Sequence, residues 1–165
     1  MKTVVCNTGP ILHLNEANIL YLLKLTGNVI IPKAVDIELL EINRKWKDEK
    51  PSWITVDSLP ERKISFVVSL CTAGFLDRGE AEAIVMAQHL KADWFLTDDS
   101  SARSFAGMID LEVHGSLGVV LWAAATNQLK YEEAKDAIYK LANTSLWISK
   151  TILEKAYKAL DEMFK

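Results

Sequence analysis

Cysteine is scarce in this chain of 165 residues, which contains only Cys6 and Cys71. Neither belongs to a Cys-x-x-Cys pair or to a cysteine–histidine cluster, so the sequence has no signature of a disulfide framework or of a zinc site with the usual ligand spacing. Cys6 lies within a short apolar run. We therefore expect Cys6 to be a buried free thiol rather than half of a disulfide.

An excess of positive charge and long apolar runs are lacking as well. Nineteen Lys and Arg against 22 Asp and Glu leave a formal charge of −3, so the surface as a whole does not favour nucleic acid. Such binding would need a local basic patch or bridging metal ions. No apolar run approaches the ~18 residues of a membrane span, and no charged-then-apolar leader precedes the first predicted strand. We expect a cytoplasmic protein that does not associate with membranes.

Several catalytic motifs are missing too. The sequence has no GxSxG elbow, no Walker lysine loop and no GxGxxG after the first predicted strand. The GSLG segment at 115–118 is interpreted first as a tight turn and alternatively as a phosphate-binding turn. His13, His89 and His114 are isolated in the sequence, which is typical of packed or surface histidines. The five tryptophans show no RNA-recognition pattern, and we expect them to pack in the core or on the surface.

What the chain does contain is an alternation of strand and helix patterns. Half of the residues are apolar, which is enough for one sizeable core. Short runs of β-branched and aromatic residues predict strands at 3–6, 28–31, 53–56, 93–97 and 111–114. Helical periodicity predicts helices within 11–23 and at 33–46, 61–72, 76–90, after Asp99, at 116–127 and twice from Tyr131 onward, with a break near 143–149.

This alternation predicts an α/β fold with a mostly parallel central sheet covered by helices on both faces, in three α/β/α layers. Right-handed crossovers would place the carboxyl ends of all strands along one edge, where ligands bind in open α/β folds. No internal repeat or linker interrupts the chain. We expect a single domain over 1–165, with a core at about 1–127 and a helical tail at 128–165.

Polar residues fall at the predicted strand ends and on apolar helix faces. Asn7 ends the first predicted strand, and Asp98 and Asp99 follow the fourth. Glu38 lies on the apolar stripe formed by Val35 and Ile42. A carboxylate on a buried stripe is costly unless it is paired, protonated or bound to a metal.

Glu80 presents the same pattern, because the positions three, four and seven residues later are Ala83, Ile84 and Ala87. Two such carboxylates, together with acids at the edge of the sheet, suggest a shared cation.

The same residues also have purely structural interpretations. Asp77 and Glu80 fit a capping box, and Glu38 could pair with a Lys or Arg of a neighbouring element. Glu82, offset by two residues from Glu80, is expected to be solvated or to support Glu80. Helix capping would account equally well for Asn7, Thr8, Asp98 and Asp99.

In the order and spacing of five blocks, the chain resembles a PIN domain of the branch close to VapC-like toxins. The blocks are VVCNTGPILHL, VIIPKAVDIEL, LDRGEAEAIVMA, WFLTDDSSAR and VHGSLGVV, which together cover about residues 3–125. This resemblance implies a compact α/β/α nuclease that holds one or two Mg²⁺ or Mn²⁺ ions in a cluster of acids and cleaves RNA.

Carried over residue by residue, the resemblance implies that Asn7, Glu38, Glu80 and Asp99 form the catalytic set. Glu38, Glu80 and Asp99, with Asp98 beside it, would be the metal ligands. The departure is Asn7, which takes the place of the Asp that the family usually has at the end of the first strand. An amide oxygen can still ligate a metal or bind its water but brings no charge, so we expect weaker metal affinity rather than a destroyed site.

Four further residues are candidates for substrate binding: Thr8, Lys33, Arg103 and Ser116. Thr8 matches the hydroxyl residue that follows the first acid in the family, and Lys33 and Arg103 would contact phosphates if they lie near the site. The resulting hypothesis is a metal-dependent endoribonuclease, the toxin of a toxin–antitoxin pair, with RNA, a small antitoxin protein and a second copy of the chain as partners.

Two alternatives stay open. A catalytically impaired PIN domain that binds RNA or protein would account for Asn7. A receiver-like domain that uses Asp98 and Asp99 for phosphate chemistry is more remote, because the chain lacks an acidic pair near its start.

Overall fold

A single sheet of five parallel strands forms the centre of the computed structural model, which describes residues 1–165. The strands follow the order β3-β2-β1-β4-β5. Their bounds are β1 Thr3–Cys6, β2 Asn28–Pro32, β3 Ile54–Asp57, β4 Trp94–Leu96 and β5 Val113–His114. All five predicted strands are present, and the predicted parallel sheet is confirmed.

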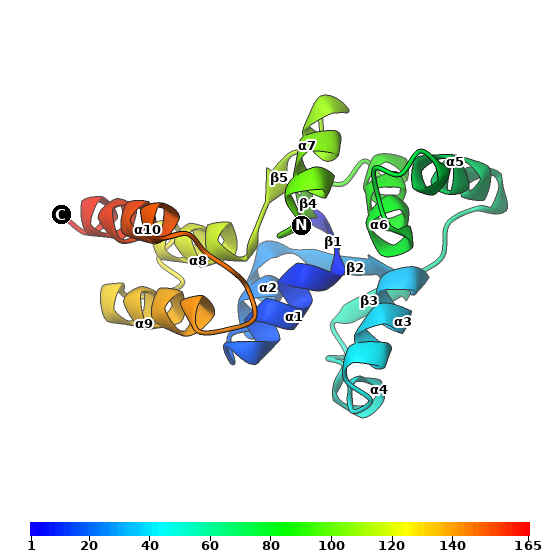
Figure 1. The fold of residues 1–165 in the computed structure, drawn as a ribbon. Helices are drawn as coiled ribbons and strands as arrows, with labels where there is room; N and C mark the ends of the chain where they lie inside the picture. Colours follow the sequence, from blue (N-terminus) through cyan, green and yellow to red (C-terminus); the bar gives the residue numbers. More distant parts are fainter.

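Ten helices connect and cover these strands. They are α1 Thr8–Glu16, α2 Tyr21–Thr26, α3 Lys33–Ile42, α4 Trp46–Glu49, α5 Glu61–Thr72, α6 Arg78–His89, α7 Ser100–Met108, α8 Ser116–Ala125, α9 Tyr131–Ala142 and α10 Lys150–Met163. Helices α5, α6 and α7 lie on one side of the sheet, and α1, α2 and α3 lie on the other (Figure 1). The three-layer α/β/α arrangement expected from the sequence is confirmed.

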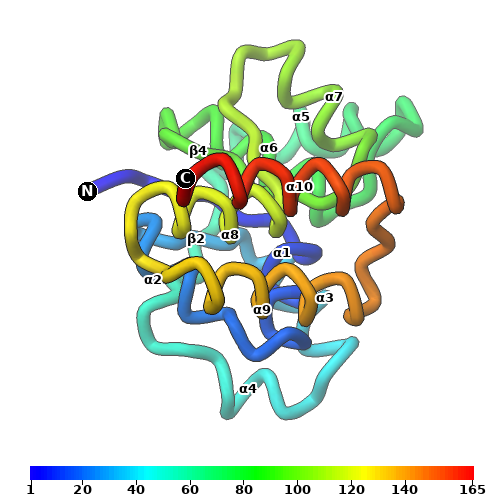
Figure 2. The backbone as a smooth tube through the Cα atoms, turned by 90° about the vertical axis from the view of Figure 1, so that its left-hand side faces the viewer, coloured from blue at the N-terminus to red at the C-terminus, as the bar shows by residue number.

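The helical tail packs on the side of this core. Helices α9 and α10 lie next to each other and against α8 (Figure 2). Their inward residues Ile138, Leu141 and Leu160 are fully buried and belong to the same apolar cluster as the core of the sheet. No helix of the fold combines the length and the apolar composition that crossing a bilayer requires.

The centre of the core explains two features of the sequence. Val4, Val5 and Cys6 of β1 are fully buried, and the Cys6 thiol is free, as expected. Burial, with a smaller contribution from Asp98, raises the pKa of this thiol well above its usual value. Helix α6 is buried over nearly its whole circumference between the sheet and α5, which accounts for its small and apolar AEAIVMA run.

The helix predicted over 33–46 is correct as far as Ile42 and wrong for the residues directly after it. Helix α3 ends at Ile42, because Asn43 takes an extended conformation and its side-chain oxygen accepts a hydrogen bond from the Lys45 backbone N–H at 3.1 Å. This local bond competes with helix continuation. Ile42, placed on the buried stripe by its spacing, is 55% exposed.

Candidate active site

The candidate site is built where the neighbouring strands β1 and β4 end. The Asn7 N–H donates to the Leu96 carbonyl at 2.9 Å and so extends the ladder by one residue. Asn7 is 5% exposed and caps α1, because its Oδ1 accepts from the Thr8 N–H at 2.9 Å. Its Nδ2 donates to Thr97 Oγ1 at 3.3 Å. Asn7 is therefore a cap whose side chain also faces the residues that follow β4.

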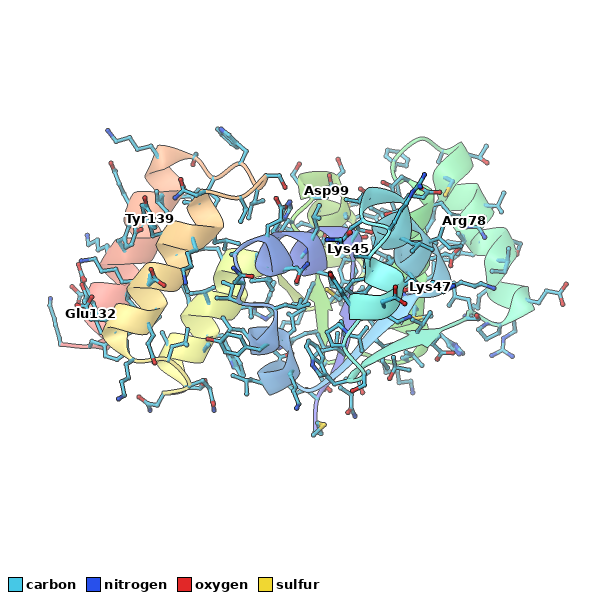
Figure 3. All side chains as sticks on the ribbon, turned by 90° about the horizontal axis from the view of Figure 1, so that it is seen from below. Lys45, Lys47, Arg78, Asp99, Glu132 and Tyr139 are labelled. Carbon is cyan, nitrogen blue, oxygen red and sulfur yellow. The ribbon has the colours of Figure 1, made fainter.

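A cavity of about 310 Å³ opens beside Asn7, and none of its lining residues is apolar. The lining residues are Asn7, Thr8, Gly9, His13, Glu38, Asp77, Glu80, Thr97, Asp98 and Asp99. The lining thus includes all five residues expected to be catalytic or to bind the metal, and also Thr8, the hydroxyl residue next to Asn7. These six residues come from four separate parts of the chain. Asp99 stands at the start of α7 (Figure 3).

Glu38 reaches this cavity from α3. Its Oε2 accepts a hydrogen bond from Thr8 Oγ1 at 2.5 Å, and its carboxylate also accepts from the Gly79 backbone N–H in the first turn of α6. No Lys or Arg pairs with it, so the expected structural alternative of an ion pair is wrong. Burial raises the pKa of Glu38 above its usual value, and the two hydrogen bonds partly oppose this shift.

Gly79 is a component of the site that sequence reasoning missed. A Cβ atom at this position would lie 2.2 Å from Glu38 Oε1 and 2.7 Å from Glu38 Cδ. Only glycine lets the carboxylate approach the end of α6 this closely. The signal was the glycine within DRGE, which a helix pattern alone does not explain.

Glu80 serves in the capping box of α6 and also faces the cavity. The Glu80 N–H donates to Asp77 Oδ1 at 2.8 Å, and the Asp77 N–H donates to Glu80 Oε2 at 3.0 Å. Burial, together with the neighbouring carboxylates of Asp77 and Asp99, raises the pKa of Glu80 to about 7. The capping interpretation is correct, and it places the Glu80 carboxyl among other acids.

The two adjacent aspartates after β4 differ in their partners. Asp98 accepts hydrogen bonds at both oxygens, from the Ser116 N–H at 2.7 Å, from Ser116 Oγ at 2.5 Å and from His13 Nδ1 at 2.7 Å. Asp99 caps α7 through Oδ2, which accepts from the Ala102 N–H at 2.8 Å, and its other oxygen makes no hydrogen bond. Asp99 is therefore the better placed of the two to bind a ligand.

His13 was expected to be an isolated packing or surface residue, whereas the structure places it in the cavity against Asp98. The two residues are 85 positions apart, so only the pairing of β1 with β4 brings them together. Thr97 was missed for a similar reason. Its hydroxyl accepts from Asn7 Nδ2 and from the Asp99 N–H, which links the two strand ends.

Lys33 and Arg103 do not line the acidic cavity. Lys33 lies in an adjoining hollow of about 460 Å³ that shares only Glu38 with the cavity. Glu82 lines this hollow too and makes no hydrogen bond with Glu80. It is 8% exposed and pairs with Arg78 Nε at 2.6 Å, so the expectation of a solvated Glu82 is wrong.

Ser116 is fully buried and binds Asp98, so its hydroxyl supports that carboxylate instead of facing a substrate. The preceding Gly115 leaves no room for a side chain, since a Cβ would lie 2.7 Å from Arg103 Nη2 and 2.9 Å from Asp98 Oδ1. Gly115 is thus the close connection between β5 and α8, and Ser116, Leu117 and Gly118 already belong to the first turn of α8. The tight turn expected over 115–118 is therefore limited to Gly115.

The donor chemistry of the cavity suits a hard divalent cation. Its charged groups are carboxylates and its other polar groups are mostly oxygens. Burial, and to a smaller extent repulsion by Asp77 and Asp99, raises the pKa of Glu80. Mg²⁺ prefers such oxygen ligands and often uses only one or two carboxylates with several waters. In the present side-chain arrangement, however, no group of three or more His, Cys, Asp or Glu is positioned to hold one ion. The residues are of the types that bind such an ion, but their side chains would have to move inward to coordinate one ion together.

The chain was compared with protein-family models, with curated proteins and with solved structures. A family model described as a PIN domain, DUF3368, matches residues 3–162, which is nearly the whole chain. No curated protein and no solved structure matches this chain.

Proposed function

Since the chain belongs to the PIN domain family, a nuclease superfamily, we propose that it is a divalent-metal-dependent endoribonuclease. The observation that carries this proposal is the gathering of Glu38, Glu80 and Asp99 around one wholly polar cavity at the carboxyl edge of the sheet. Ligands bind at this edge in open α/β folds. Three carboxylates without a neutralising Lys or Arg in the cavity create a strongly negative site that suits a cation.

In this proposal Glu38, Glu80 and Asp99 hold the ion. A bound Mg²⁺ or Mn²⁺ would supply charge neutralisation at the phosphate and an activated water. Thr8 keeps the Glu38 carboxylate in place through its hydroxyl. His13 and Ser116 fix Asp98, which positions the chain segment that carries Asp99.

Glu80 is the residue that moves a proton. With a pKa of about 7 in the metal-free site, its carboxyl is partly protonated at neutral pH. A cation favours the carboxylate form, so metal binding is expected to release a proton from Glu80. Metal affinity should consequently rise with pH across neutrality.

The cellular role that we propose is that of a toxin paired with a small antitoxin protein, acting as a homodimer in the cytoplasm. Expression of the chain alone should then arrest growth, and Glu38→Gln should relieve the arrest. Arrest of equal strength by this variant would contradict a nuclease-based toxin.

The biochemical test is cleavage of RNA by the purified protein. We expect cleavage with Mn²⁺ or Mg²⁺, none in EDTA, and a loss of at least 100-fold in Glu38→Gln, since this change removes a charge from the proposed ligand set. Glu41→Gln is the matched control, because Glu41 is an exposed acid on the same helix outside the cavity. Absence of metal-dependent cleavage, with Glu38→Gln indistinguishable from the unmodified protein, would refute the proposal.

Asn7 supports a second candidate function, a PIN domain that binds RNA or protein without cleaving it. The amide is neutral and already caps α1. Calorimetry with Mn²⁺ separates the two, because binding with release of a proton supports the nuclease and an absence of binding supports the second candidate.

A further inference from the structure

A groove of about 430 Å³ adjoins the acidic cavity on the side of β5 and α8. The segment 143–149 between α9 and α10 forms its other wall and passes close to α8 and α1 (Figure 1). Asp98 lines both the groove and the cavity, so the two spaces lie next to each other at this residue. The floor is apolar and consists of Val113, Leu117, Leu121, Leu146, Ile148 and Ile152.

Trp147 stands at this groove with 83% of its surface exposed. The other four tryptophans are buried or half-buried, so Trp147 is the one of the five whose side chain is exposed. The segment around it is held in place, because Ser145 Oγ and the Ser145 N–H both donate to the Glu16 carboxylate, at 2.5 and 3.3 Å. The Leu146 N–H also donates to Thr144 Oγ1 at 3.2 Å. An exposed indole on a fixed segment is a preorganised surface for stacking.

The charges of the groove favour an anionic ligand at the end that meets the cavity. Arg103 lines this end and forms no ion pair, and its one hydrogen bond is a long contact of 3.4 Å from Nη2 to the Thr97 carbonyl. The only carboxylate of the groove, Asp98, is already bound by His13 and Ser116.

The hollow that shares Glu38 with the cavity is lined by three glutamates against two basic residues, Lys33 and Arg78, which leaves one net negative charge. In the groove, Arg103 offsets the charge of Asp98. The groove therefore offers a polyanion the less repulsive approach to the site.

We propose that this groove binds single-stranded RNA beside the cleavage site, with a base stacked on Trp147 and a phosphate at Arg103. The inference rests on the proposed ribonuclease function, and it names the form of RNA that the site accepts. A paired base cannot offer its face to an indole, so stacking selects single strands. A protein partner or a second copy of the chain would bury the apolar floor equally well, but it would have no need of the unpaired Arg103 guanidinium beside the acidic cavity.

Binding of a labelled single-stranded oligoribonucleotide of about 10 nucleotides, followed by fluorescence anisotropy in EDTA, tests the proposal apart from cleavage. We expect Trp147→Ala to weaken binding about 5- to 150-fold, the range for loss of one stacked base. Trp147→Phe should retain most of the affinity. Tyr139→Ala, which removes an exposed aromatic of α9 outside the groove, should change nothing. Bound RNA should also shield the exposed indole from acrylamide quenching.

Equal affinity of Trp147→Ala and the unmodified protein would overturn the proposal, as would equal binding of a duplex of the same sequence or no RNA binding at all. A change of oligomeric state in Trp147→Ala without a change in RNA affinity would assign the groove to a second copy and overturn it too. Cleavage is measured separately with Mn²⁺. Cleavage without dependence on Trp147 would refute the groove alone, whereas binding through Trp147 without any cleavage would refute the nuclease alone.

Discussion

Replacing Asn7 by Asp restores the charge that the family usually has at the end of the first strand. The new carboxylate would face the cavity that Glu38, Glu80 and Asp99 also line. Two unit charges 4 Å apart interact by about 4 kcal/mol at an effective dielectric constant of 20. Hydration of the ion and of the open site reduces the gain, so we expect about 1–3 kcal/mol, or a roughly 10- to 100-fold lower Kd for Mn²⁺.

Without metal the same change should destabilise the protein. Asn7 is 5% exposed, and burial together with the neighbouring acids already raises the pKa of Glu80 to about 7. One more buried carboxylate adds repulsion and removes the Nδ2 donor to Thr97. The melting temperature of Asn7→Asp should therefore fall in EDTA and recover with Mn²⁺.

Isothermal calorimetry and RNA cleavage provide the measurements for this variant. Asn15→Asp is the control, because it adds the same charge at an exposed position of α1, about 12 Å further along the helix, where salt screens it from the site. Equal Mn²⁺ affinity and equal cleavage in Asn7→Asp and the unmodified protein would show that Asn7 is only a helix cap and would refute the reasoning.

Three further changes probe the site and the fold. Gly79→Ala puts a methyl group 2.2 Å from Glu38 Oε1 and should weaken Mn²⁺ binding at least 10-fold by calorimetry, whereas Gly107→Ala, with open space around its Cβ, should leave it unchanged. In metal-free protein the raised pKa of Glu80 contributes stability that is fully present below about pH 4.5 and is lost as pH rises through about 7. Glu80→Gln should flatten this part of the pH dependence of urea unfolding, by roughly 1 kcal/mol after solvent screening, and an unchanged slope would contradict the assignment. Removal of 128–165 should leave an insoluble or unfolded chain, because α9 and α10 bury core residues; a soluble, cooperatively melting fragment would show a separate domain.

Much of the fold could be predicted from the sequence because its signals are local. The runs TVVC, NVII and WFL are β-branched or aromatic and lie between helical patterns, and each forms a strand at or within two residues of its expected place. Asn43 shows the limit of periodicity, because its own side chain ends α3 where the apolar spacing would continue it.

The candidate site was predictable only in part. Acids at strand ends and on apolar helix faces pointed to Glu38, Glu80 and Asp99, and the topology gathers them as expected. The partners of these acids depend on contacts between distant segments, such as His13 with Asp98, and local sequence patterns do not contain them.

Surface exposure was harder still to predict. Trp147 is an ordinary apolar residue by composition, and only the path of the 143–149 segment leaves its indole in solvent.

The most direct test of the proposed metal site is a crystal structure of the protein soaked in Mn²⁺, with anomalous scattering used to locate the ions. We predict anomalous density within the polar cavity, bound by carboxylate oxygens of Glu38, Glu80 and Asp99, with the side chains turned inward from their present positions. The same crystals of Glu38→Gln should show weaker density or none. Water alone in the cavity at high Mn²⁺ concentration would contradict the assignment of this cavity as a metal-dependent active site.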